Sequence, residues 1–336
     1  MLSAPCSPFN HLHFSLGLPL RQTTMCPPAA SAFAAAPPDP VLHEFRFFRV
    51  YESGRVEKLH PTTQFVPASA SLSAHGFTVL SKDVVISADP PVSARLFLPA
   101  SVCTDPTERV PLLFYVHGGG FTFESAFSPE THGYVSELVS RVHCVAVSVE
   151  YRLAPAVPIP ACYDDSWATF RWVMAHKEGN GPEEWIARYA DLEKVFVAGD
   201  SAGGNISHDI AVRIGESGLK IQGAVLSHPF FGGTEDDAMW LYMCPGNNGL
   251  YDRRLRPRVE DLRRVGCRKV LVLAAEKDHL RASAESYVEE LRKSRWEGEA
   301  ELVVFEGEDH CFHLKDLVYQ KSVILVDKIV SFVNGD

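Results

Sequence analysis

The chain has 336 residues, of which 46% are hydrophobic and 22% charged, and its formal net charge is -10 at pH 7. This length allows one large α/β domain with a full core, which we favour over two smaller domains. The acidic balance argues against a nucleic-acid partner, because binding to a phosphate backbone depends on clustered Lys and Arg. No run of about 20 apolar residues occurs, so we expect no membrane span.

The first 40 residues are expected to form a disordered or targeting-like extension. Residues 1–38 contain no Asp or Glu and only one Arg, which loosely resembles a plastid transit peptide. A second methionine, Met25, precedes a run rich in Pro and Ala, as in a variable, disordered start. The eight cysteines are scattered singly without CxxC pairs, which favours free buried thiols in a reducing compartment over a zinc site. We therefore expect a cytoplasmic protein, with a plastid location as the alternative.

Residues 41–336 are expected to form the folded domain, of the α/β class. Segments 43–51, 77–86 and 92–99 alternate like half-buried antiparallel strands. From Pro111 onward, short apolar runs alternate with helical patterns, which predicts βαβ crossovers and a mainly parallel sheet with the N-terminal strands as an antiparallel edge. The predicted parallel strands are 111–116, 144–151, 194–200, 223–229, 269–278 and 301–307, and the predicted helices are 131–141, 164–176, 203–215, 281–295 and 317–333.

A serine between glycines follows one of these buried runs directly. The segment GDSAGGN (199–205) fits the pattern GxSxG, in which a strand turns sharply into a helix and the flanking glycines avoid Cβ clashes. Such a turn would hold Ser201 in strained backbone angles and aim its hydroxyl out of the sheet. A structural turn bounded by glycines is the alternative, since the pattern alone is a weak signal.

A run of three glycines follows another predicted strand, in YVHGGGF (115–121). The peptide N–H groups of Gly119 and Gly120, with that of Ala202, could converge on one carbonyl oxygen and form an oxyanion hole. A phosphate-binding loop is the rival interpretation, but it would need a following Lys or a third glycine at GxGxxG spacing. We expect His117 to anchor the loop and not to titrate during turnover.

A serine nucleophile also needs a base and an acid to orient that base. Asp278 ends the run 269–278, and His310 lies just beyond 301–307, so both occupy loops at strand ends in the order Ser, Asp, His. Ser201, Asp278 and His310 are therefore the predicted nucleophile, acid and base.

Four neighbouring residues are weaker candidates for these roles. Glu276 is the second choice for the acid, because we expect it inside the strand's last residues. Asp309 is expected at the surface, since adjacent residues rarely orient a ring well. His313 is expected to be structural or to line the pocket, and His279 is a lesser rival as base.

Seven short motifs are spread along the folded part of the chain: HGGGF (117–121), VEYRLAP (149–155), YDD (163–165), GDSAGGN (199–205), MWLYMCPG (239–246), AEKDHLR (275–281) and GEDHCFHL (307–314). Taken together, they resemble the motifs of plant carboxylesterases in the hormone-sensitive-lipase-like branch of the α/β hydrolases, over roughly residues 41 to 334. The resemblance implies the same triad and oxyanion hole, a cap made from the N-terminal segment and the stretch after 223–229, a small-molecule ester as substrate, and no metal or organic cofactor. It leaves open whether the protein is a monomer or a homodimer.

Two related activities and three departures qualify this expectation. Gibberellin receptors of the same family have lost the catalytic histidine and the last glycine of HGGG, whereas this chain keeps His310 and Gly120. Isoflavanone dehydratases share the triad, so a lyase is an alternative.

The chain reads Ala156-Val157 where the family usually has Glu-His, its segment 234–238 is shorter than the family norm, and its N-terminal tail is longer. We expect a serine carboxylesterase for short to medium acyl esters, with a wider or less ordered pocket on the cap side.

Overall fold

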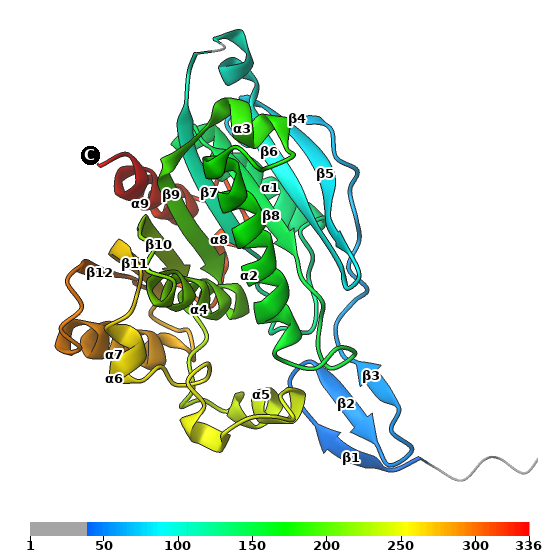
Figure 1. Cartoon of the computed structure of the whole chain (residues 1–336). Helices are drawn as coiled ribbons and strands as arrows, with labels where there is room; N and C mark the ends of the chain where they lie inside the picture. Colours follow the sequence, from blue (N-terminus) through cyan, green and yellow to red (C-terminus); the bar gives the residue numbers. More distant parts are fainter. Residues whose placement is uncertain (1–38, 106, 336) are drawn as a thin grey trace, which may run out of the picture. The chain divides into compact units, whose positions relative to one another are not determined.

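The computed structural model describes residues 39–105 and 107–335, and those from Pro40 onward belong to one compact unit (Figure 1). The predicted extension, residues 1–40, lies almost entirely outside the described residues. No helix in the described ranges is long and apolar enough to cross a membrane. Of the six described cysteines, none is paired; Cys103 is exposed, against expectation, Cys311 is partly buried, and the other four are buried.

A nine-stranded mixed sheet forms the centre of this unit, with the strand order β12-β11-β10-β9-β7-β8-β6-β5-β4. The strands from β7 to β12 pair in parallel, because their apolar runs are joined through helices, and β4 to β6 form an antiparallel edge beside β8. The bounds are β4 (Ala70–Leu72), β5 (Thr78–Ala88), β6 (Pro91–Pro99), β7 (Val110–Val116), β8 (Val145–Glu150), β9 (Ala190–Asp200), β10 (Ile221–Ser227), β11 (Cys267–Ala275) and β12 (Glu299–Phe305).

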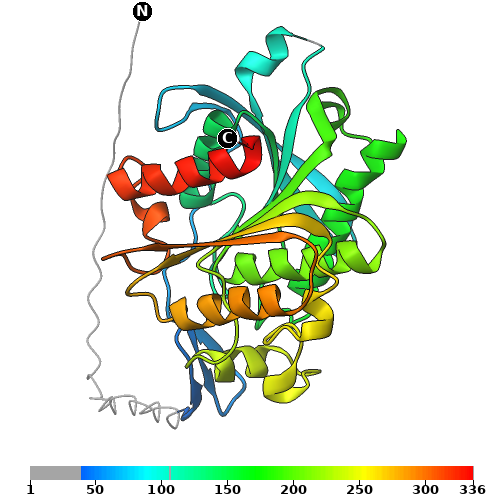
Figure 2. The same cartoon turned by 90° about the vertical axis from the view of Figure 1, so that its left-hand side faces the viewer.

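Helices cover both faces of this sheet, as the continuous apolar strands predict. Buried residues of α1 and α9 share one core cluster with one face, and those of α2, α4 and α7 share another cluster with the opposite face (Figures 1 and 2). The helices are α1 (Pro129–Val142), α2 (Ala161–Met174), α3 (Glu184–Tyr189), α4 (Ala202–Glu216), α5 (Asp237–Met243), α6 (Val259–Leu262), α7 (Arg281–Lys293), α8 (Phe312–Lys315) and α9 (Gln320–Asn334), with 3-10 turns η1 (Ala100–Thr104), η2 (Ala175–Glu178) and η3 (Gly249–Tyr251). The short α3, α5, α6 and α8 were not among the predicted helices.

The predicted strand 43–51 is wrong as a single strand of the central sheet. It is broken into β1 (Val41–Glu44) and β2 (Phe48–Tyr51), which form a separate antiparallel sheet with β3 (Val56–Lys58). The N–H of Phe45 donates to the carbonyl of Phe48 at 2.9 Å and closes a tight turn between them. Strand-like residues continue on both sides of the turn, so their alternation does not reveal it. Arg46 and Phe47 consequently lie at the tip of a hairpin.

This hairpin lies beside α5, the helix that follows β10 (Figure 1). The ring of Tyr242 from α5 is within 5.9 Å of the rings of His43, Phe45 and Phe48, measured between centroids. The N-terminal segment and the stretch after β10 therefore meet, as the cap expectation requires. The loops that follow β7, β9, β11 and β12 gather at the carboxyl ends of the parallel strands.

Candidate active site

Ser201 occupies the sharp turn between β9 and α4 and has the strained backbone angles φ 53° and ψ −117°. The turn is possible because glycines flank it at close approaches. A Cβ on Gly199 would lie 2.4 Å from the carbonyl oxygen of Gly203, and one on Gly203 would lie 2.0 Å from that of Val116. Neighbouring backbone fixes the turn, since the N–H of Ser201 donates to the carbonyl of Ser227 at 2.8 Å.

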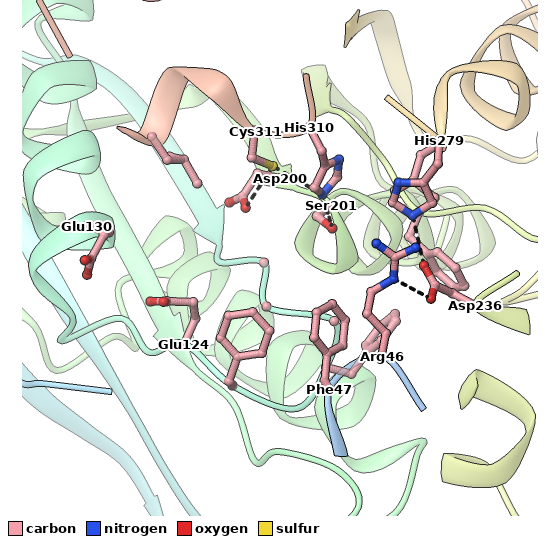
Figure 3. Close-up of a pocket in the computed structure, with 18 of the residues that line it drawn as sticks. Arg46, Phe47, Glu124, Glu130, Asp200, Ser201, Asp236, His279, His310 and Cys311 are labelled. Atoms are coloured by element: carbon pink, nitrogen blue, oxygen red, sulfur yellow. Dashed lines mark hydrogen bonds and ion pairs between the residues drawn. The ribbon is translucent and has the colours of Figure 1, made fainter. Parts of the chain in front are cut away.

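The predicted base lies beside this serine (Figure 3), and the predicted acid contacts the base. Nε2 of His310 is 3.0 Å from Oγ of Ser201, and Nδ1 of His310 is 2.8 Å from Oδ2 of Asp278. A proton on Nδ1 satisfies the carboxylate and leaves the Nε2 lone pair facing the hydroxyl. The three residues that the sequence places at strand ends thus form one hydrogen-bonded chain.

The carboxylate of Asp278 is buried and accepts several hydrogen bonds. Burial alone would raise its pKa, but hydrogen bonds from His228, His310 and the N–H of Leu280 outweigh that cost and hold the pKa of Asp278 below its usual value. Asp278 therefore stays ionised at neutral pH and can orient and stabilise a protonated imidazole.

The glycine loop after β7 presents its backbone to the same cavity. Gly119 and Gly120 have φ of +89° and +56°, and both line the cavity with Ser201. The hydroxyl of Tyr151 donates to the carbonyls of His117 and Gly118, each at 2.9 Å, which holds this part of the loop in place. Within the described ranges, the N–H groups of Gly119 and Gly120 donate to no acceptor.

Ala202 supplies the third N–H of the predicted oxyanion hole. It is the first residue of α4, so its N–H is one of the donors that the helix leaves without an intrahelical acceptor. His117, by contrast, is held away from any chemistry: its ring stacks on Tyr151 at 4.2 Å between centroids and its Nδ1 lies 3.0 Å from the carbonyl of Gly118. Burial lowers the pKa of His117 to about 4, so it remains neutral.

The weaker candidates fall outside the hydrogen-bonded chain from Ser201 to Asp278. Glu276 lies in an exposed turn just past β11, and not inside the strand as expected. Asp309 is exposed and accepts from the N–H of His310 at 2.7 Å. His313 is fully buried and stacks on another histidine, His228. His279 borders the cavity, but its Nε2 lies 2.9 Å from Asp236.

The cavity in front of Ser201 has a volume of about 690 Å³. Figure 3 shows Glu124 and Glu130 on one side of Ser201, and Arg46, Asp236 and His279 on the other. Between these polar groups, the wall is largely aromatic and aliphatic, as expected of a pocket for a small organic molecule. The apolar lining residues are Phe47, Phe121, Phe123, Phe230, Met239, Trp240, Leu280 and Leu314.

Some groups at this site had no place in the sequence analysis. Asp200, next to the serine, is buried, and the hydroxyl of Tyr115 donates to its Oδ1 at 2.5 Å. Burial raises the pKa of Asp200 to about 6, although the Tyr115 hydrogen bond opposes the rise. His228 is a second imidazole on Asp278. It directly follows β10, so the rule that chemistry collects at strand ends could have identified it.

One cluster of side chains in the described ranges has potential metal ligands close together. It consists of His228, Asp278 and His310, whose ligand atoms lie within 4.8 Å of one another. The same atoms are at hydrogen-bond distances from one another: Nδ1 of His228 lies 3.2 Å and Nδ1 of His310 lies 2.8 Å from Oδ2 of Asp278.

Comparison with known proteins relates this site to a family. Residues 113–314 match the α/β hydrolase fold family. The chain is 41% identical over 318 residues to probable carboxylesterase 13 of Arabidopsis thaliana, covering 85% of this chain and 95% of that protein. It is 40% identical over 305 residues to tuliposide A-converting enzyme b3, amyloplastic, of Tulipa gesneriana, covering 86% and 79%. A solved esterase from the hyperthermophilic archaeon Pyrobaculum calidifontis aligns with a TM-score of 0.63 and 26% identity, over 76% of this chain and 85% of that one.

Proposed function

Because this chain belongs to the plant carboxylesterases of the α/β hydrolase fold, we propose that it hydrolyses carboxylic esters through Ser201, His310 and Asp278. The observation that supports this most directly is the hydrogen-bonded chain from Oγ of Ser201 through His310 to Asp278, with distances of 3.0 and 2.8 Å. An intact histidine beside the serine favours turnover over the binding-only role of a hormone receptor.

In the first half of the reaction, the hydroxyl of Ser201 attacks the ester carbonyl as Nε2 of His310 takes its proton. Asp278, ionised and hydrogen-bonded to Nδ1, stabilises the imidazolium that forms. The carbonyl oxygen becomes an anion, which the N–H groups of Gly119, Gly120 and Ala202 stabilise. Donors of this kind each contribute about 100- to 1,000-fold in rate. His310 then passes its proton to the alcohol as it leaves.

In the second half, water replaces the alcohol. His310 removes a proton from the water as its oxygen adds to the acyl carbonyl. The tetrahedral intermediate then collapses, and His310 returns the proton to Oγ of Ser201 as the acid is released. Every proton that moves is held by His310 at some stage, so the cycle needs no further redox or metal partner.

The cavity supports short to medium acyl esters as the substrate class. Its volume of about 690 Å³ holds a small organic molecule, and Phe230, Met239 and Trp240 offer apolar surface for an acyl chain. Although segment 234–238 is short, the cavity still has an apolar wall on the cap side, because α5 supplies Met239 and Trp240.

The proposal is tested by hydrolysis of p-nitrophenyl acetate and butyrate by the wild type and Ser201→Ala. We expect the variant to lose at least about 1,000-fold in kcat, together with the pre-steady-state burst of p-nitrophenol. Ser207→Ala is the matched control, since Ser207 is buried in the same helix and its hydroxyl has no hydrogen-bond partner in the described part of the chain. Equal rates for wild type and Ser201→Ala would refute the assignment.

We propose the cytoplasm as the location and the plastid as the alternative. One similar protein is named as mitochondrial and another as amyloplastic, so sequence similarity alone does not identify the compartment. Imaging of the full chain fused at its C-terminus to a fluorescent protein, compared with the same fusion lacking residues 1–40, decides between them. Plastid fluorescence that depends on residues 1–40 would support the alternative.

A further inference from the structure

His228 is a second histidine on the acid of the proposed triad. It directly follows β10 and has a positive φ of 48°, a conformation that most side chains avoid. Its N–H donates to the carbonyl of Leu273 at 2.6 Å, which fixes the backbone beside β11. This geometry directs the imidazole into the protein, where its side chain is 0% exposed.

The imidazole of His228 shares one oxygen atom with the catalytic imidazole. Nδ1 of His228 is 3.2 Å from Oδ2 of Asp278, and Nδ1 of His310 is 2.8 Å from the same oxygen. The two rings are nearly perpendicular, with an interplanar angle of 83° and centroids 5.7 Å apart. Two donors thus reach one carboxylate oxygen from different directions.

The surroundings of His228 determine which nitrogen carries its proton. Burial lowers the pKa of His228, with the hydrogen bond to Asp278 opposing that effect, so the ring is neutral near pH 7. A neutral ring can donate to Asp278 only with its proton on Nδ1. Nε2 is buried and has no partner among the described residues, and His313 covers the ring face at an interplanar angle of 9°.

We propose that His228 is a positioning residue that holds the Asp278 carboxylate in place and withdraws part of its negative charge from His310. The first effect keeps Oδ2 directed at Nδ1 of the catalytic ring. The second weakens the support that Asp278 gives to the protonated form of His310, so that the base stays free to accept a proton from Ser201. This inference rests on the proposed triad and adds a role that the triad alone does not require.

Other ionisable groups around this pair also act on its titration. His310 and Asp309 act on His228 from the loop after β12, His313 acts from α8, and His279 lies 3.4 Å from Oδ1 of Asp278. Asp200 interacts with His310 from the end of β9. All five groups remain in place when His228 alone is replaced, so a change in the pH profile reports the lost hydrogen bond.

Two substitutions in the full-length chain separate hydrogen bonding from packing. His228→Asn places an amide nitrogen near the position of Nδ1 and tolerates a positive φ. His228→Leu has a similar size and no donor. We expect His228→Leu to lower kcat for p-nitrophenyl butyrate about tenfold, with KM within twofold, and to move the acidic limb of kcat/KM to higher pH by about half a unit. His228→Asn should stay near the wild type in both.

Three results would overturn the inference without touching the proposed function. The first is a folded His228→Leu variant with wild-type kcat and acidic limb, and the second is an equal loss of kcat in the Asn and Leu variants. The third is available even if His228→Leu fails to fold: nitrogen NMR of histidine-labelled wild type should show His228 protonated on Nδ1, and protonation on Nε2 would contradict it. Loss of the proposed function would instead appear as activity that does not depend on Ser201.

Discussion

The imidazole of His313 lies parallel to that of His228, with ring centroids 5.2 Å apart and an interplanar angle of 9°. His313 is fully buried, although it is only three positions from His310. Its two ring nitrogens are buried and have no partner in the described ranges, and burial holds its pKa well below the usual value. A neutral, enclosed ring of this kind cannot exchange protons with a substrate.

The two histidines should consequently differ when each is replaced by alanine. We expect His310→Ala to lose about 10⁴-fold or more in kcat for p-nitrophenyl butyrate. His313→Ala should keep kcat within about tenfold but lose about 1–3 kcal/mol of unfolding free energy, because it removes a packed core ring. Steady-state kinetics and urea unfolding measure the two effects. Loss of activity confined to the His313 variant would show that the wrong base was assigned.

The positions of Ser201, Asp278 and His310 at strand ends were sufficient to predict that they lie together. A parallel sheet places the carboxyl ends of its strands along one edge. Each residue follows a buried apolar run, and three such runs far apart in the chain converge on one cavity. The glycines of the turn were predictable for the same reason, since their close approaches depend only on the strand-turn-helix geometry. The periodicity of apolar residues predicted the sheet, and the order of the motifs predicted the proposed triad.

Other parts of the site depend on geometry that no local pattern encodes. Phe47 reaches the glycine loop only because a turn interrupts the predicted strand 43–51, and neighbouring aromatic residues mask that turn. His228 reaches Asp278 only because its φ is positive, which directs the ring inward. The raised pKa of Asp200 arises from burial, which becomes known only once Tyr115 and the surrounding strands are packed.

The hairpin tip is joined to the segment before α5 by an ion pair between Arg46 and Asp236, with Nε and Oδ1 2.9 Å apart, and by a second contact to Glu235. Because Arg46 lines the cavity, we expect Arg46→Met to loosen the tip and raise KM about two- to fivefold with little change in kcat. Added salt should raise KM of the wild type more than that of the variant, since it screens the pair. Initial rates at low and high ionic strength measure both effects.

Arg49→Met is the matched control for this experiment. Arg49 belongs to the same hairpin, but it pairs with Glu44 at 2.9 Å and does not line the cavity. Its replacement should leave KM and the salt dependence unchanged. A similar rise in KM for both variants would indicate general loosening of the hairpin and contradict a specific role for the Arg46 contact.

Phe47 presses on the glycine loop closely enough to exclude a side chain from it. A Cβ on Gly120 would lie 2.3 Å from the ring of Phe47. Gly120→Ala should therefore displace either the loop or the hairpin and lower kcat/KM by about 100-fold, within the range for loss of an oxyanion donor. If the ring is the obstacle, Phe47→Ala in the same chain should recover about tenfold of that loss. A double-mutant cycle of kcat/KM measures this coupling.

Gly54→Ala serves as the control for backbone strain alone. Gly54 has a φ of +84° and open space around it, in the turn that joins β2 to β3. We expect a loss of about 1 kcal/mol in unfolding free energy and unchanged kcat/KM. If Phe47→Ala gives no recovery in the Gly120→Ala background, the effect of the alanine comes from its own strained φ and not from contact with the ring.

Asp200 makes stability depend on pH in a direction opposite to that of a salt-bridged carboxylate. Burial raises its folded-state pKa from 3.8 to about 6, so its stabilising protonated form is complete below about pH 4 and is lost as the pH rises through 6. Asp200→Asn removes this titration and can still accept the hydrogen bond from Tyr115. Relative to wild type, the variant should therefore gain about 1 kcal/mol between pH 5 and pH 8, since one pKa unit is about 1.4 kcal/mol. Urea unfolding at both pH values measures the gain, with the exposed Asp316→Asn as the control. A variant that loses stability relative to wild type as the pH rises would mean that Asp200 is held ionised in the folded protein.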